Sequence, residues 1–198
     1  VRCCTQNGVR GGSATVHFPI WHQEIEDILV LKNNKGTEDN RVRKLDYSIQ
    51  ISKLFYERFI KDEEITLFSP HDVPGLYEAF GMPEFDELYE KYERSYKTPK
   101  TKIRAQELMG AMLKERAETG RIYIMNIDHC NTHSSFKDKV YMSNLCQEIT
   151  LPTTPVQHID DENGEIALCI LSAVNLGLIR DKHDLEELCD LSVRALDE

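Results

Sequence analysis

The feature that most constrains the fold is the regular exchange of strand-like and helix-like stretches along the chain. Apolar residues alternate over 46–52 (DYSIQIS) and 121–128 (RIYIMNID), and a short strand is predicted over 64–70. Such alternation is typical of strands with one buried face. Residues 164–173 (GEIALCILSA) are apolar almost throughout, which predicts a strand buried on both faces.

Helix-like spacing of apolar residues separates these strands. Helices are predicted over 21–31, 54–59, 76–80 and 85–92, from Pro99 to about Glu118, and from about Leu185 to Leu196. Thr98 and Pro99 are predicted to start the long helix, and Gly120 is predicted to end it. The exchange of strands and helices favours an α/β fold with mostly parallel strands, in a single segment over 1–198 without an internal boundary.

Composition and charge restrict the classes of function. The 198 residues, 40% apolar and 29% charged, are enough for one domain of ordinary soluble composition. A net charge of −10 repels phosphate backbones, so nucleic acid is not an expected partner. We recognise neither a signal peptide nor an apolar run long enough to span a bilayer, so no membrane partner is expected. The chain begins with Val1 and its first residues are typical of mid-protein sequence, so we expect a longer parent.

The six cysteines are scattered at positions 3, 4, 130, 146, 169 and 189. This spacing is unlike a dense disulfide framework and favours a reducing cytoplasm. Cys130 and His133 could be drawn as a zinc site together with Cys146 and Cys169. Structural zinc ligands usually come in closely spaced pairs, so no metal site is predicted. His129 and His133 are predicted to form local hydrogen bonds instead.

The stretch SNLCQEITLPT (143–153) places Asn144, Cys146 and Glu148 at alternate positions. In an extended backbone these three side chains would share a face, so that an amide, a thiol and a carboxylate would point into the same space. Glu148 could then act as a base, Asn144 as a hydrogen-bonding group and Cys146 as the reacting atom. On the pattern alone, an inert buried thiol is favoured at Cys146, and a core residue at Cys169.

The Gly-rich stretch QNGVRGG (6–12) lacks the lysine of a Walker A motif and the context of a dinucleotide-binding motif. It is either a flexible surface loop or a mobile recognition loop. In the second case Gly8, Gly11 and Gly12 would permit unusual backbone angles, and Gln6 and Arg10 would supply hydrogen bonds.

Longer segments together resemble the large, catalytic subunit of ribonucleotide reductase, most closely the aerobic class I type. These segments are NGVRGGSAT, VLKNNKG, NRVRKLDY, LFSPHDVPGLYEAF, ERAETGRIYIMNIDHCNTH, SNLCQEITLPT and NGEIALCILSAVNLG. They follow the order of the family and cover almost the whole chain. Because they are far more specific than a short motif, they reverse the preference for inert cysteines.

The resemblance implies part of a ten-stranded α/β barrel, incomplete in this chain, with the reactive cysteine on a finger loop inside it. By the same match, Cys146 forms a thiyl radical that takes the 3′ hydrogen of a ribonucleotide. Glu148 removes the 3′-hydroxyl proton, and Asn144 hydrogen-bonds the sugar hydroxyls. Cys169 matches one member of the redox cysteine pair that becomes a disulfide. We expect such a site to be enclosed, because a radical must be kept from water.

The Gly-rich stretch matches the loop that links the specificity effector site to the substrate base, with Gln6 and Arg10 at base-contacting positions. The resemblance implies ATP or deoxynucleoside triphosphates with Mg²⁺ as effectors, and no cofactor bound tightly by this chain. It also implies several partners. These are a small subunit with a di-iron tyrosyl radical, the remainder of the large subunit and its homodimer, and thioredoxin or glutaredoxin as reductant.

Parts of the family pattern are missing. Cys3 and Cys4 do not match the second redox cysteine, which lies upstream in the family. We therefore expect this chain alone to leave the barrel open and to be inactive. Two alternatives remain open at this point: an inactive nucleotide-binding relative or split-subunit piece, and a zinc-stabilised structural domain.

Overall fold

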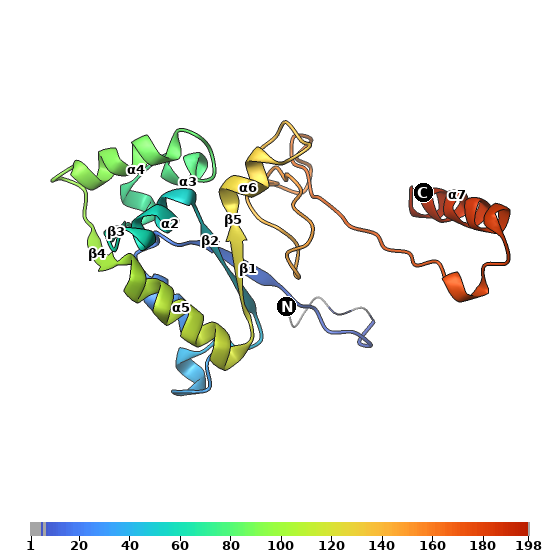
Figure 1. Cartoon of the computed structure of the whole chain (residues 1–198), viewed down its shortest axis with the longest axis horizontal. Helices are drawn as coiled ribbons and strands as arrows, with labels where there is room; N and C mark the ends of the chain where they lie inside the picture. The colour runs from blue at the N-terminus through green and yellow to red at the C-terminus, as the bar shows by residue number, and fades with distance from the viewer. Residues whose placement is uncertain (1–4, 6, 198) are drawn as a thin grey trace. The chain divides into compact units, whose positions relative to one another are not determined.

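The computed structural model describes residue 5 and residues 7–197 of the chain. The chain forms two compact units, Val1–Pro152 and Thr153–Glu198. Figure 1 labels most of their helices and strands. The first unit contains both sheets and most of the helices, and the second unit contains a 3₁₀ turn and one long helix.

The centre of the first unit is a parallel sheet of three strands in the order β1-β2-β5. The strands are β1 (Thr15–Pro19), β2 (Asp46–Ile51) and β5 (Ile122–Asn126). Parallel neighbours require crossover connections, which here contain helices. The main ones are α1 (Ile25–Leu29), α2 (Lys53–Ile60) and α5 (Ala105–Thr119). The sheet confirms the predicted strands near 46–52 and 121–128, whereas β1 was not predicted.

The two faces of this sheet differ in chemistry. One face carries Ile49, Ile51 and Ile122, which pack in a buried cluster with Leu108 and Met112 of α5. Successive side chains of a strand point to opposite faces, so the residues between these apolar ones lie on the other side. That side is polar on β1 and β2, where it carries Thr15, His17, Ser48 and Gln50. In Figure 1, α5 lies on one side of the sheet and the coil that follows α6 lies on the other.

A second core cluster of the first unit forms around the aromatic residues Trp21, Phe68, Phe80, Phe85 and Tyr89. It includes residues of the helices α3 (Leu76–Ala79), α4 (Phe85–Arg94) and α6 (Ile127–Thr132). The antiparallel pair β3 (Glu64–Leu67) and β4 (Thr101–Arg104) packs with the first cluster, in which Ile65 and Leu67 are buried. The long helix predicted from Pro99 begins only at Ala105, because residues 101–104 pair with β3. Gly120 ends that helix as predicted, with φ +66°.

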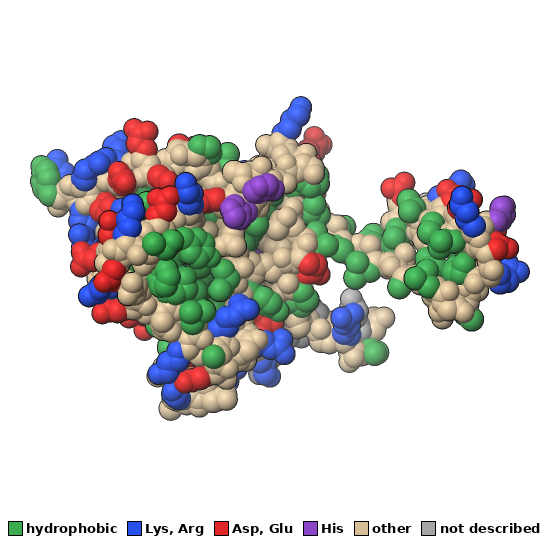
Figure 2. All heavy atoms as spheres, in the orientation of Figure 1, with side chains coloured by type: hydrophobic (Ala, Val, Ile, Leu, Met, Phe, Trp, Pro, Cys, Tyr) green, Lys and Arg blue, Asp and Glu red, His purple; other side chains and the backbone are tan. Residues whose placement is uncertain are grey.

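The second unit contains the helix α7 (Lys182–Asp197) and a short 3₁₀ turn, Leu176–Leu178. The buried strand predicted over 164–173 is wrong for this structure. Apart from one bridge between Thr154 and Glu165, the stretch is irregular, and its large apolar side chains are exposed. Leu191 and Val193 of α7 are exposed as well, and Figure 2 shows apolar side chains gathered over this helix.

The physical reason lies in what surrounds the stretch. An apolar strand is buried on both faces only where neighbouring strands and covering layers are present. Within the described residues of the second unit, Thr154 provides the single β bridge to this stretch. None of the described helices is both long enough and apolar enough to cross a lipid bilayer.

Candidate active site

A loop over residues 141–150, here called the cysteine loop, is held against the polar face of the parallel sheet. Four side chains of β1 and β2, the sheet donors, bond to it: Thr15, His17, Ser48 and Gln50. Thr15 Oγ1 donates to Leu145 O (2.7 Å), His17 Nε2 to Ser143 O (3.2 Å), Ser48 Oγ to Gln147 Oε1 (3.1 Å) and Gln50 Nε2 to Tyr141 O. The polar face of the sheet therefore holds the cysteine loop in place through side-chain hydrogen bonds.

The tip of the cysteine loop is a tight turn. The N–H of Gln147 donates to the carbonyl of Asn144 at 3.2 Å, and Gln147 has a left-handed φ of +67°. Leu145 and Cys146 are the two central residues of this turn. The predicted extended backbone from Asn144 to Glu148 is therefore wrong, and the strand-like alternation of side chains between two faces does not hold here.

Hydrogen bonds across the base of the turn explain why it forms. The Asn144 side-chain Oδ1 accepts from the N–H of Ile149 at 2.9 Å, and the Ser143 hydroxyl donates to the Ile149 carbonyl at 2.6 Å. Asparagine favours turns because its side-chain carbonyl can bond nearby backbone in this way. A loop rather than a strand thus carries Cys146, in agreement with the loop that the resemblance implies.

The three residues of the predicted constellation differ in exposure. Cys146 and Glu148 are exposed, and Asn144 is half-buried. The enclosure expected around Cys146 is not provided by the described residues of this chain. What the turn does provide is an accessible thiol with a carboxylate two residues away, on a loop whose backbone is bonded to a sheet.

His17 is the titratable member of the sheet donors. Burial lowers the pKa of His17, and the hydrogen bond to the Ser143 carbonyl offsets this only in part. A carbonyl can only accept, so the neutral ring carries its proton on Nε2. Nδ1 is buried without a hydrogen-bond partner among the described residues. A second proton on Nδ1 would therefore lack an acceptor, which agrees with the lowered pKa.

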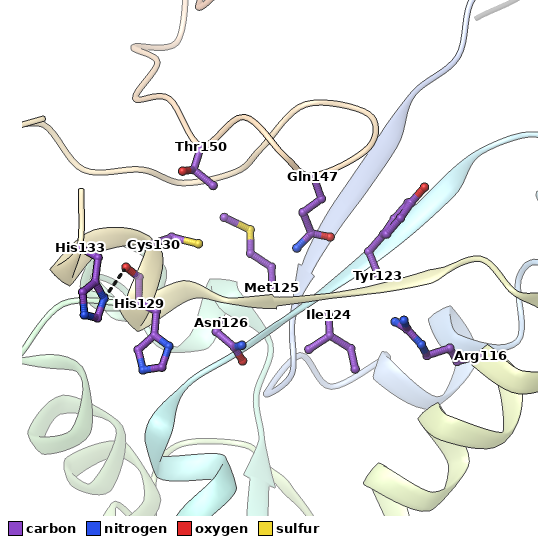
Figure 3. Close-up of a pocket in the computed structure, with 10 residues that line it drawn as sticks. All are labelled: Arg116, Tyr123, Ile124, Met125, Asn126, His129, Cys130, His133, Gln147 and Thr150. Atoms are coloured by element: carbon purple, nitrogen blue, oxygen red, sulfur yellow. Dashed lines mark hydrogen bonds between the residues drawn. The ribbon is translucent and has the colours of Figure 1, made fainter. Parts of the chain in front are cut away.

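A pocket of about 530 Å³ lies between the cysteine loop and the edge of β5 (Figure 3). Its lining comes from α5, β5, α6 and the loop: Arg116, Tyr123, Ile124, Met125, Asn126, His129, Cys130, His133, Gln147 and Thr150. Burial raises the pKa of the Cys130 thiol, and the nearby Asp128 carboxylate adds to this effect. The prediction of local hydrogen bonds is confirmed for His133, whose Nδ1 lies 3.3 Å from the His129 carbonyl oxygen.

Comparison with known proteins identifies the family. The family model described as "Ribonucleotide reductase, barrel domain" matches residues 1–198. The chain belongs to this family. The resemblance inferred from the sequence and the α/β barrel class are thereby confirmed.

Three curated relatives of this ribonucleotide reductase segment illustrate the similarity. Proteins named ribonucleoside-diphosphate reductase subunit alpha from Buchnera aphidicola subsp. Schizaphis graminum and from Haemophilus influenzae are each 60% identical over 100% of this chain. The Escherichia coli protein named ribonucleoside-diphosphate reductase 1 subunit alpha is 58% identical over 79% of the chain. The chain spans 27% of the length of the first two relatives and 21% of the third.

The other residues predicted from the ribonucleotide reductase resemblance lie elsewhere in the chain. Cys169 belongs to the second unit and is exposed rather than buried in a strand. Gln6 lies outside the described residues. Gly8 has a left-handed φ of +74° and is exposed, as are Arg10 and Gly11, whereas Gly12 is half-buried. The described part of the chain contains no group of three or more His, Cys, Asp or Glu side chains arranged to hold a metal ion.

Sequence reasoning missed the sheet donors. A signal for them exists, because Ser48 and Gln50 occupy the polar positions of the alternating stretch DYSIQIS. Both side chains are nevertheless buried, at 0% and 1% exposure. Polar residues opposite an apolar strand face normally indicate solvent, and nothing local in the sequence shows that a distant loop covers them.

Proposed function

We propose that this chain is the central part of the large subunit of a cytoplasmic ribonucleoside-diphosphate reductase, and that Cys146 is its reactive cysteine. The observation that carries the proposal is the exposed thiol at the tip of a tight turn, on a loop bonded to four donors of the parallel sheet. A loop fixed to a sheet in this way favours chemistry that depends on the position of one sulfur atom. Family membership and the Asn–x–Cys–x–Glu pattern support the same assignment.

In the proposed reaction Cys146, as a thiyl radical, takes the 3′ hydrogen of the substrate ribose. Glu148 accepts the proton of the 3′-hydroxyl, and the 2′-hydroxyl leaves as water after it takes a proton from one of the two thiols of the redox pair. The Asn144 Oδ1 is bonded to the Ile149 N–H, so we assign its amide Nδ2 to donate a hydrogen bond to a sugar hydroxyl. The carboxylate of Glu148 supports this role because it is exposed and therefore accessible to a ligand.

Two thiols supply the two electrons of the reduction and become a disulfide, and the hydrogen atom then returns from Cys146 to C3′. We assign Cys169 as one of the two thiols. Its exposure supports access to a sugar and to a second thiol, which we place in the remainder of the large subunit. Thioredoxin or glutaredoxin would reduce the disulfide. A small subunit would supply the radical from its di-iron tyrosyl centre.

For the Gly-rich stretch we propose a role in selecting the substrate base. An effector nucleoside triphosphate with Mg²⁺ would bias this loop between two conformations, which is coupling between two sites in the thermodynamic sense. The exposure of Arg10 and the left-handed backbone of Gly8 support a loop that can reach a ligand. Gln6 is assigned to this role from the sequence match alone.

The test uses the full-length large subunit together with its small subunit and a ribonucleotide. Cys146→Ser should abolish both turnover and exchange of the 3′ hydrogen, because serine cannot form the thiyl radical. Cys169→Ser should lose turnover driven by the reductant while early 3′ chemistry persists. Cys189→Ser, which changes another exposed thiol of the second unit, is the matched control and should keep normal turnover. Near-normal turnover of Cys146→Ser would remove the assigned role.

A further inference from the structure

The sheet donors bond to the cysteine loop at regular intervals. Their partners are residues 141, 143, 145 and 147, every second residue of the loop. The residues assigned to chemistry above are 144, 146 and 148. The contacts with the sheet therefore fall on residues other than the three assigned to chemistry, and three of the four are made to main-chain carbonyls.

The donors themselves stand on a rigid support. They come from β1 and β2, and the opposite face of these strands is packed in the core, where Ile49 is 0% exposed. Functional groups held by strands are placed more accurately than groups held by loops alone. A displacement of about 1 Å at a reacting atom is enough to lower a rate by about a hundredfold.

The bond at the tip of the loop has a particular role. Gln147 adopts a left-handed backbone that is unfavourable for a residue with a side chain, and such strain persists only where the surroundings stabilise it. The Gln147 side-chain oxygen accepts a hydrogen bond from the fully buried hydroxyl of Ser48 at 3.1 Å. This bond joins the strained residue directly after Cys146 to the centre of the sheet.

We propose that the sheet donors are positioning residues for Cys146, and that the bond from Ser48 to Gln147 sets where the thiol stands. The inference rests on the proposed function, in which the position of that sulfur limits the reaction. Neither Ser48 nor Gln147 touches the substrate in this scheme. Both act through the backbone of the turn.

The test is a double-mutant cycle in the full-length large subunit with its small subunit. The variants are Ser48→Ala, Gln147→Leu and the double variant, with Ser95→Ala as control. Ser95 lies outside the cysteine loop and the pocket lining, and its hydroxyl accepts a hydrogen bond from the Lys97 N–H instead. The measurements are kcat and KM at saturating effector, and deuterium uptake of the peptide that covers 143–149.

Each single variant should lower kcat about tenfold, with KM changed less than about twofold, because one hydrogen bond that orders the transition state is lost. Deuterium uptake in 143–149 should rise in both. The double variant should be no worse than either single variant, because both remove the same bond. Ser95→Ala should leave both measurements unchanged.

Several results would overturn the positioning role. They are a normal kcat in both single variants, effects that multiply to about a hundredfold in the double variant, and a lowered kcat without any change in loop exchange. Cys146→Ser is measured beside the cycle. If it kept turnover, the proposed function would fail, whereas the exchange data would still decide whether Ser48 and Gln147 hold the loop.

Discussion

Strand β2 and the stretch 164–173 were both predicted to be strands, but their structures are opposite. In β2, Ile49 is 0% exposed and the strand is bonded to a neighbour on each edge. In the other stretch Ile170 is 63% exposed, and the backbone is irregular beyond Glu165.

The difference shows that an apolar segment becomes a buried strand only where neighbouring strands and helices cover it. Strand β2 lies between β1 and β5 and has α5 across its apolar face. The 164–173 stretch has the composition for such a place, but the described residues around it form no sheet. The chain spans 27% of the length of two relatives, so we expect the remainder of a barrel to provide these neighbours.

The largest expected effect tests this comparison directly. In the 198-residue chain, Ile49→Ala should lower the free energy of unfolding by about 2–5 kcal/mol, because it leaves a cavity in a packed core. Ile170→Ala should change it by less than about 0.5 kcal/mol, because this side chain already meets solvent. Urea unfolding followed by circular dichroism, together with the fluorescence of the single buried Trp21, measures both.

The same pair of substitutions in a full-length subunit makes the comparison sharper. There Ile170→Ala should approach the cost of Ile49→Ala, if the complete barrel buries the stretch. An Ile170→Ala cost that stays near zero in the longer protein would contradict the idea that missing neighbours explain the exposed stretch.

The parts of the fold predicted correctly from the sequence depend on local patterns. Strands β2 and β5 follow from alternating apolar residues, and the end of α5 follows from Gly120. Strand β4 was missed because Thr98 and Pro99 resemble a helix start, while the pairing of residues 101–104 with β3 is not visible locally. Tertiary pairing overrode a reasonable local signal.

At the candidate site, the sequence identified residues better than it identified geometry. The pattern of Asn144, Cys146 and Glu148 singled out the tip of the cysteine loop, but it suggested an extended backbone. The turn depends on bonds to Ile149 and to strand residues about a hundred positions away, such as Ser48. No local pattern contains contacts over that separation, so the positioning residues could not be predicted.

A smaller effect is expected when one ion pair of each unit is removed and the losses of stability are compared. In the first unit Arg58 and Glu93 form two hydrogen bonds of 2.7 Å, with side chains only 11% and 19% exposed. Glu93→Gln should cost about 2 kcal/mol, because it leaves a largely buried guanidinium without its anion. In the second unit Arg194 and Asp190 are 73% and 59% exposed, and Asp190→Asn should produce no measurable change in unfolding. A measurable loss for Asp190→Asn would contradict the contrast.

The smallest effect is the pH dependence of the Glu93 contribution. Burial raises the pKa of Glu93, but hydrogen bonds from Arg58 and Thr66 outweigh it, so the net pKa is lowered below 4.5. A carboxyl with a lowered folded-state pKa stabilises the fold above its unfolded pKa, and this contribution is lost as the pH falls through the folded value. The difference in unfolding free energy between the native chain and Glu93→Gln should therefore be constant from pH 7 to about pH 5 and shrink below it. Because other carboxylates titrate in both proteins, the difference isolates Glu93, and a gap that widened on acidification would show that its carboxylate does not stabilise the first unit.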